Sequence, residues 1–362
     1  MEKADPLDPG KEQDLRTKIL SGSQDLRVYR ALVEILMDSG RENETLAVLE
    51  KALDLPLSDI DRSAISAQVA WILYGLGRTD RAITMAKTAL THVEGETDLR
   101  QVLMIRGLSH ATLAACHYYK DRTLSQWEAQ LAIESFERLL NNHPDFEDFA
   151  LMCRYAAGVY AMQEEYAKAI ALYEQAIRGA PSKSNRLYCL LCIGRALCSQ
   201  GQYAQAERRL REALELVEAD AQLLPRVYFE LGRVQRLSER PEVAVESFEQ
   251  AMTALGLGPH LPRDQELDRE INWELGNLYY DAGRFADAIA AFRNALPGLP
   301  EPYPYFDTLI SLGHCYLIIG HYERARECYD EVLASEKASK EEKATAQDGL
   351  SRLPPLPPPR IH

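Results

Sequence analysis

The amino-acid sequence predicts an all-helical solenoid of about eight stacked helix-turn-helix repeats, closed by a C-terminal capping helix. Three observations predict it. Small and aromatic residues recur in one order, the recurrences usually start 37 residues apart, and a glycine often separates the two halves of a copy. Each half has the spacing of an amphipathic helix, and one such hairpin cannot bury its apolar face alone. Stacking of neighbouring hairpins would supply the core.

The clearest copy is NWELGNLYYDAGRFADAIAAFRNAL, residues 272 to 296. Gly276 and Tyr279 belong to its first helix and Phe292 to its second, each with helical spacing to other small or apolar residues. Gly283 lies between the two helices and suits the left-handed conformation that ends a helix. We expect Gly276 to allow close approach of the two helices, and the aromatic residues to fill the space against the neighbouring hairpin.

The same order of residues returns along most of the chain. Looser copies occupy the N-terminal half. Longer connections or longer helix ends are expected between the second helix of one copy and the first helix of the next. The repeat domain is predicted to cover residues 26 to 339. Its copies are expected to begin near residues 26, 63, 100, 150, 187, 225, 269 and 306.

The two ends of the chain differ from the repeats. Residues 1 to 25 form an N-terminal extension with a short helix, and residues 340 to 353 form a polar capping helix with Ser339 as its N-cap. Residues 354 to 362 are a proline-rich tail that favours polyproline II. Arg352, Pro355 and Pro358 have the spacing that SH3-like domains read, but such tracts are common, and a stiff disordered tail after the helix is the simpler explanation.

The order Leu-Gly, aromatic, Gly, Ala, aromatic, Ala resembles the tetratricopeptide repeat, whose usual length is 34 residues. The resemblance covers nearly all of the chain between residues 26 and 339. It implies a right-handed solenoid whose concave groove is lined mainly by the first helix of each copy. Members of this family use the groove to bind proteins or peptides, so we expect a protein partner here.

The third copy departs from the regular length by about 13 residues. The additional residues include CHYYKDRTLSQWEAQ, which carries Tyr118, Tyr119 and Trp127. Lengthening of both helices, which then pack on each other, is one explanation. A role as a lid over a ligand is the other.

Composition limits the function classes. The chain has 41 Lys and Arg against 55 Asp and Glu, a net charge of -14, which argues against nucleic-acid and anionic-membrane binding. No secretory signal begins the sequence, and no apolar run is long enough to span a bilayer. The seven cysteines are scattered among amphipathic segments, as expected for reduced apolar side chains. We expect a cytoplasmic protein.

No pattern of an active site is found. The sequence lacks a nucleophile elbow, a phosphate-binding loop and an H-E-x-x-H motif, and no cofactor or metal is predicted. Cys189 and Cys192 form a C-x-x-C, but neither a second pair nor a nearby histidine completes a zinc site. The sequence therefore predicts that the protein is not an enzyme.

On the resemblance, the second, fifth, ninth and twelfth positions of each first helix line the groove. Arginines gather at these positions in the middle of the chain, which would make a local site for carboxylates. Our hypothesis is that they bind an acidic peptide, and the alternative is that they pair with acidic side chains of adjacent helices. The candidate ligand-binding residues are Arg154, Arg195, Arg226, Arg233, Arg236, Trp273, Asn277, Tyr280 and His314.

Some members of the family hold a C-terminal carboxylate with Lys, Asn and Arg residues on successive first helices. This chain departs from that pattern. Arg30 occupies the fifth position of the first copy, but Glu34 occupies the ninth, and Gln68 stands where an asparagine is required. The sequence therefore does not predict a receptor of that kind.

The functional prediction is a scaffold or adaptor without catalytic activity, which binds a peptide or protein segment in its groove. The alternative is a regulatory sensor whose groove encloses a small molecule or a short signalling peptide. The pattern specifies no oligomeric state, because terminal repeats are found both capped and paired with another copy.

Overall fold

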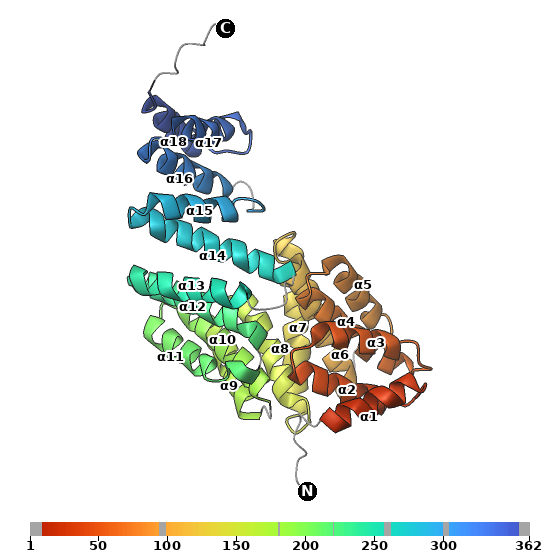
Figure 1. Ribbon diagram of the computed structural model, residues 1–362. Helices are drawn as coiled ribbons and strands as arrows, with labels where there is room; N and C mark the ends of the chain where they lie inside the picture. The colour runs from red at the N-terminus through yellow and green to blue at the C-terminus, as the bar shows by residue number, and fades with distance from the viewer. Residues whose placement is uncertain are drawn as a thin grey trace. The chain divides into compact units, whose positions relative to one another are not determined.

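The protein is described by a computed structural model that covers residues 9–93, 99–179, 182–219, 221–256, 262–299 and 304–354. Within these ranges every regular element is a helix, and the helices follow one another as hairpins (Figure 1). The chain divides into two compact units, Met1–Glu230 and Leu231–His362. Helix α12, Leu224–Leu237, runs across the boundary between them.

The first unit contains α1 to α11 and two short 3-10 helices. Each pair of consecutive helices from α2 onward packs together as a hairpin, and the first helices α4, α6 and α8 also pack on one another. The helices are α1 Pro9–Leu20, α2 Leu26–Asp38, α3 Glu42–Ala52, α4 Asp59–Gly75, α5 Thr79–Leu90, α6 Arg100–His117, α7 Arg122–Asn142, α8 Phe149–Met162, α9 Tyr166–Gly179, α10 Lys183–Ser199, α11 Tyr203–Leu214, η1 Val217–Ala219 and η2 Ala221–Leu223.

The second unit contains the end of α12 and the helices that follow it. Its helices pack in chain order, and α18 lies against both helices of the last hairpin. They are α13 Pro241–Gly256, α14 Pro262–Asp281, α15 Phe285–Ala295, α16 Tyr305–Ile318, α17 Tyr322–Ala334 and α18 Lys340–Ser351. Together with the stacked hairpins of the first unit, this confirms an all-α solenoid fold.

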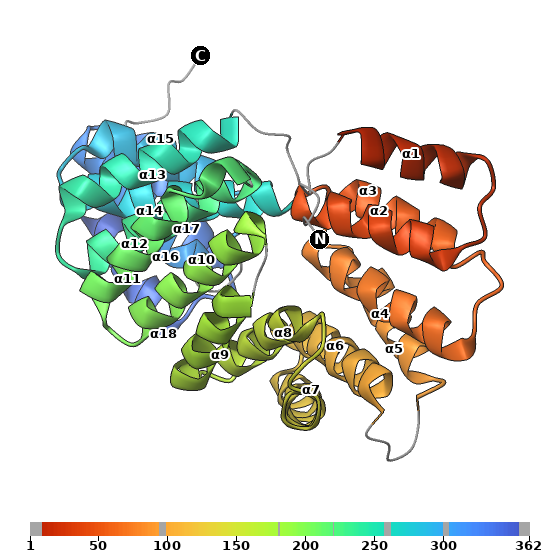
Figure 2. The same ribbon diagram turned by 90° about the horizontal axis from the view of Figure 1, so that it is seen from below.

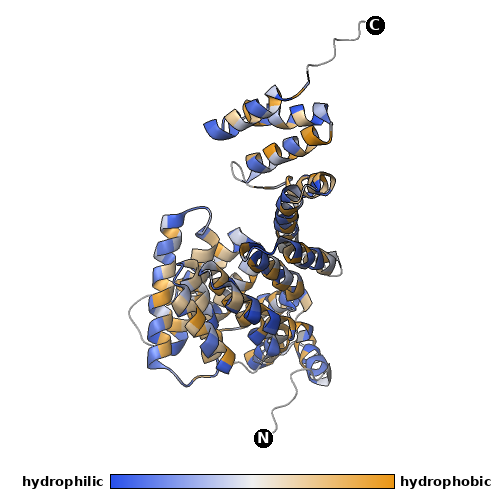
Figure 3. Ribbon diagram, turned by 90° about the vertical axis from the view of Figure 1, so that its left-hand side faces the viewer, coloured by the Kyte–Doolittle hydropathy of each residue, from blue (hydrophilic) through white to orange (hydrophobic). Residues whose placement is uncertain are grey.

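Stacking places the first helices of the first unit on one side. Figure 2 shows α4, α6 and α8 on the inside of the arc that the hairpins of this unit follow, with α5, α7 and α9 outside. Trp71 of α4 and Tyr155 of α8 meet across this inner side, with ring centroids 4.9 Å apart. The hairpins therefore present an inner surface made by first helices. Polar and apolar residues alternate along the helices, as stacking of amphipathic hairpins requires (Figure 3).

The small residues mark close helix contacts, as the sequence pattern predicts. A Cβ atom added at Gly276 of α14 would lie 2.5 Å from the ring of Phe292 of α15. Gly283, in the turn between these helices, has a φ of 72°, which a glycine adopts without strain. Tyr279 of α14 reaches the preceding hairpin, where its hydroxyl donates to Glu249 at 2.8 Å. The repeated glycine and aromatic positions thus build the contacts within and between hairpins.

The additional residues of the third copy lengthen both of its helices. Helix α6 has 18 residues and α7 has 21, and the two pack along each other. His110 and Glu128 form a contact of 2.6 Å between them, and the Ser125 hydroxyl donates to the carbonyl of Ala114 at 2.8 Å. The insertion therefore extends the hairpin itself.

Both ends of the described chain carry a helix that covers a terminal hairpin. Ser339 caps α18 through a capping box with Glu342, as the sequence predicts for Ser339. Gly349 of α18 lies against the ring of Tyr329, which is fully buried. The tail beyond residue 354 lies outside the described residues, so polyproline II in residues 355 to 362 remains a prediction.

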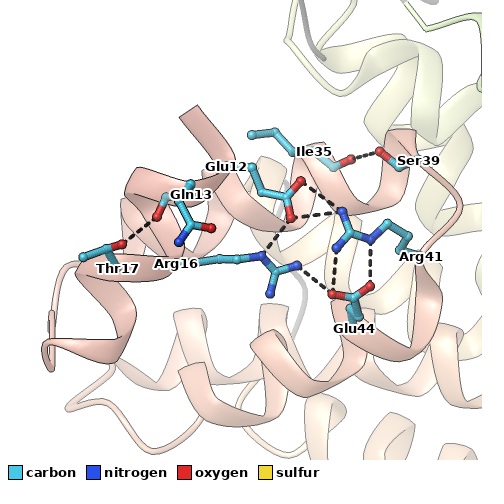
Figure 4. Close-up of polar contacts among 8 residues, drawn as sticks. All are labelled: Glu12, Gln13, Arg16, Thr17, Ile35, Ser39, Arg41 and Glu44. Carbon is cyan, nitrogen blue, oxygen red and sulfur yellow. Dashed lines mark hydrogen bonds and ion pairs between the residues drawn. The ribbon is translucent and has the colours of Figure 1, made fainter. Parts of the chain in front are cut away.

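A network of two arginines and two glutamates joins α1 to the first hairpin (Figure 4). Arg16 contacts Glu12 at 2.7 Å and Glu44 at 2.6 Å. Arg41 contacts Glu12 at 2.9 Å and Glu44 at 2.7 Å. Hydrogen bonds from Arg16 hold the pKa of Glu12 below its ordinary value of 4.5, and Arg41 does the same for Glu44.

Acid is therefore expected to loosen α1. Because both carboxyl pKa values are lowered in the folded state, their stabilising contribution is full above pH 4.5 and is lost as the pH falls through the folded values. Hydrogen exchange should show lower protection factors in α1 at pH 3.5 than at pH 6, and Glu12→Gln should lower protection at pH 6. Equal protection of α1 at both pH values would contradict this reading.

Candidate functional site

The predicted arginines lie on first helices, and Arg195 and Arg236 have carboxylate partners. In each case the partner belongs to the first helix of the next hairpin. In the first unit Arg195 of α10 contacts Glu230 of α12, and in the second unit Arg236 of α12 contacts Glu274 of α14. Arg195 and Arg236 thus form internal ion pairs of the kind that the alternative predicts, and ligand binding by these arginines stays a hypothesis.

Arg195 is paired with a carboxylate that is almost completely buried. Its Nε lies 3.1 Å from Glu230 Oε1, and the side chain of Glu230 is 1% exposed while that of Arg195 is 55% exposed. The charge of Glu230 raises the pKa of Arg195 above its ordinary value. Arg195 of α10 thus neutralises the buried carboxylate of Glu230 on α12.

In the second unit, Arg236 Nε lies 2.9 Å from Glu274 Oε2, and the glutamate side chain is 7% exposed. Burial raises the pKa of Glu274, although Arg236 and Arg233 both act to lower it. Arg233 therefore contributes to the environment of the same glutamate. Both arginines therefore act on Glu274 where α12 meets α14.

The other predicted residues of the second unit also have partners inside it. Asn277 donates from Nδ2 to the carbonyl of Trp273 at 3.0 Å, within its own helix. The Tyr280 ring meets Phe285 at 6.0 Å between centroids, and burial raises the pKa of the phenol. The ring centroids of His314 and Tyr329 lie 5.7 Å apart, and burial lowers the pKa of the His314 imidazole.

Arg226 and Arg154 complete the predicted set, and both lie in the first unit. The guanidinium of Arg226 lies over the ring of Phe229, 5.5 Å from its centroid. The guanidinium of Arg154 lies between two tyrosines, 5.1 Å from the ring centroid of Tyr155 and 5.0 Å from that of Tyr188. Stacking on aromatic rings is favourable for an arginine and leaves its N–H groups available at the edge.

The surroundings of Arg154 contain no acidic partner within the described part of the chain. Its Nη1 donates to Asn185 Oδ1 at 2.7 Å, and its Nε is buried without a hydrogen-bond partner there. The neighbouring Cys192 thiol and burial raise the pKa of Tyr188, so this phenol stays neutral. We call Arg154, Tyr155, Asn185, Tyr188 and Trp71, which meets Tyr155, the Arg154 cluster.

An equivalent arginine elsewhere in the first unit does have a carboxylate. Arg30 of α2 donates from Nη2 to Asp61 Oδ1 of α4 at 2.8 Å. Arg30 and Asp61 are separated by 31 residues, and so are Arg154 and Asn185. The same position on the next first helix is therefore acidic in one case and neutral in the other.

The repeat pattern of the sequence does not predict which residues surround Arg154. Tyr155 and Tyr188 belong to two different copies, and Asn185 was not assigned to the groove. One sequence signal could have found Asn185: Ser-x-x-Asp in residues 58–61 and Ser-x-x-Asn in residues 182–185 occupy equivalent positions at the start of a first helix.

The cysteines show the features of packed thiols. Each of the seven is free and buried. Burial raises the pKa of Cys153 to about 11 and that of Cys189 to about 12, which lowers the thiolate fraction at neutral pH. No group of three or more metal-ligating side chains occurs among the described residues.

A polar pocket lies at the start of α5. It is lined by Gly77, Arg78, Thr79, Asp80, Arg81 and Lys120. Arg81 is held by Glu50 at 2.7 Å, and none of the candidate residues from the sequence lines the pocket. In the described ranges, no helix has both the length and the apolar character needed to cross a bilayer.

Comparison with protein families gives consistent matches along the chain. Models described as tetratricopeptide repeat match residues 127–184 and 261–304, residues 186–255, and residues 306–338. These segments add up to more than half of the chain. They include α8, which carries Arg154, and all of α10 except Asn185.

Known proteins resemble parts or all of the chain. Tetratricopeptide repeat protein 21B of Mus musculus is 23% identical over 265 residues, which are 65% of this chain and 19% of that protein. The chain thus spans about a fifth of the length of this relative. The solved structure of the APC/C hetero-tetramer Cut9-Hcn1 has a TM-score of 0.62 at 16% identity, over 94% of this chain and 58% of that one. The structure of YrrB, a TPR protein with an unusual peptide-binding site, has a TM-score of 0.43 at 19% identity, over 60% of this chain and 100% of that one.

Proposed function

Because the chain belongs to the tetratricopeptide repeat family, we propose that it is a scaffold or adaptor without catalytic activity that binds a protein or peptide segment. The binding surface is the inner side of the first unit, where first helices face one another. The observation that carries this proposal is the Arg154 cluster, a cation between aromatic rings on two neighbouring first helices. Aromatic and arginine side chains dominate the binding energy of many protein interfaces.

The guanidinium of the Arg154 cluster, and not the charge of the whole chain, favours an acidic segment as the partner. A chain with a net charge of -14 repels acidic ligands in general, so a local cation on the inner side would select where such a segment binds. We place the protein in the cytoplasm, in keeping with seven free, buried cysteines. We propose separately that an SH3-like domain binds the proline-rich tail. Arg352 of that motif is described by the structure, whereas Pro355 and Pro358 lie outside the described residues.

Affinity capture with crosslinking and mass spectrometry tests the function. The full chain should retain a protein partner from a lysate of its source cell, and crosslinks should fall on α8 and α10 of the first unit. Capture of a metabolite without a protein partner would contradict the scaffold and favour the sensor alternative. Crosslinks confined to the outer helices α9 and α11 would contradict the proposed surface.

A further inference from the structure

One turn of the second unit exposes apolar side chains to water. Helix α16 ends at Ile318, and Gly320, with a φ of 81°, leads the chain towards α17. The exposed fraction is 54% for Ile318, 40% for Ile319 and 45% for Tyr322. A Cβ atom added at Gly320 would lie 3.9 Å from the hydroxyl oxygen of Tyr322, so Tyr322 lies beside the same turn. We call Ile318, Ile319 and Tyr322 the turn surface.

The preceding hairpin makes the same turn without large apolar residues. Its turn has the sequence Asp-Ala-Gly, where the later turn has Ile-Ile-Gly. Asp281 and Ala282 are exposed, and the glycine that follows them also has a positive φ, 72°. The two isoleucines are therefore not required to form the turn. Adjacent exposed apolar side chains are stabilised when another segment covers them, and such patches often mark a contact.

The C-terminal tail leaves the fold close to this turn. Helix α18 packs on both α16 and α17, and Figure 1 shows these three helices together. Burial lowers the pKa of His314 in α16, and the charges of Arg352 and Asp348 act on His314 as well, so the end of α18 lies near it. His314 precedes Ile318 by four residues, which is about one helical turn. The residues after α18 therefore begin near the turn surface.

The sequence of the tail suits docking on an apolar surface. Leu353 is buried, and PPLPPP follows it, a run that favours polyproline II. Because polyproline II has three residues per turn, Leu353, Leu356 and Pro359 would share one face. Residues 355–360 would span about 19 Å in this conformation, about twice the distance between packed helices, so they can cross from α18 over the turn. A chain that is already stiff loses little entropy when it docks.

We propose that residues 355–360 of the tail dock on the turn surface of the second unit. Leu356 and Pro359 would cover the two isoleucines. Arg360 would lie near Glu323 of α17, which is exposed and has no ion-pair partner among the described residues. The contact lies within the chain, so it does not depend on the partner proposed for the first unit. An SH3-like domain would have to displace the tail from the turn surface.

Backbone NMR relaxation of the Arg360 amide measures docking, because Arg360 is the first residue after the last proline run. Its order parameter should be about 0.8 in the full chain, whereas an undocked tail gives a value below about 0.6. The full-length variant Ile318→Asp with Ile319→Ala carries the Asp-Ala-Gly turn of the preceding hairpin, so it should fold. Its Arg360 value should fall below about 0.6. Ala282→Asp adds a carboxylate to the matched turn and should leave the Arg360 value unchanged.

Two full-length tail variants test the same contact without changing the repeats. Leu356→Ser removes the apolar side chain that faces the turn, so it should shift the side-chain methyl signals of Ile318 and Ile319. Pro357→Ser is the control, because residue 357 lies on another face of polyproline II. It should leave both methyl signals in place.

Three results would overturn the proposal. The first is an Arg360 order parameter below about 0.6 in the full chain. The second is an unchanged value in the folded Ile318→Asp, Ile319→Ala variant. The third is order that is lost on dilution, which would assign the tail to a second copy of the chain.

Discussion

Replacing Gly276 with alanine is expected to lower the free energy of unfolding of the second unit by about 1–3 kcal/mol. The added Cβ would lie 2.5 Å from the ring of Phe292, which is fully buried, so the ring or the helix has to shift. Alanine is a better helix former than glycine by up to about 1 kcal/mol, so the steric cost has to exceed this gain. Chemical denaturation followed by circular dichroism measures the difference.

Gly75→Ala is the matched control. Gly75 also lies in a helix, but nothing lies within 4 Å of an added Cβ, so this variant should be as stable as the parent or more stable. Adding Phe292→Leu to Gly276→Ala should recover part of the loss, because the smaller side chain leaves room for the methyl group. Equal stability of Gly276→Ala and Gly75→Ala would contradict close contact as the role of the repeated glycines.

Replacing Arg195 with methionine is expected to destabilise the first unit by about 1–3 kcal/mol. The change leaves the carboxylate of Glu230, whose side chain is 1% exposed, without the cation that lies 3.1 Å away. Because the side chain of Arg195 is 55% exposed, water can partly replace the lost cation. The loss of stability should therefore stay below that caused by breaking a fully buried ion pair. Thermal and denaturant unfolding measure the effect.

Arg208→Met is the control for this variant. Arg208 pairs with Glu212 on the surface of α11 at 3.7 Å, and such exposed pairs contribute little to stability. Arg195→Met should be clearly less stable than Arg208→Met and should still capture the partner. A variant of Arg195 with unchanged stability and no partner capture would restore this arginine as a ligand-binding residue.

The fold could be predicted from the sequence because its signals are local. Gly276 and Phe292 are only 16 positions apart, and the helical period places them on facing sides of one hairpin. Gly283 marks the turn between them through its backbone freedom alone. The register of the copies and their boundaries remain predictions.

The candidate site was harder to predict because its residues come from different copies. The sequence places Arg195 and Arg233 at the same position of consecutive copies, which suggested one shared site. The structure gives Arg195 the carboxylate of Glu230, which lies on the next first helix. Whether an inner arginine is compensated depends on that next helix, and a pattern based on single copies contains no such information.

Hydrogen exchange of the full chain, with and without its captured partner, locates the binding surface. The partner should increase protection in α8 and α10, which carry Arg154 and Asn185, and should leave α9 and α11 unchanged. Increased protection confined to α9 and α11, with none in α8 or α10, would contradict binding on the inner side of the first unit.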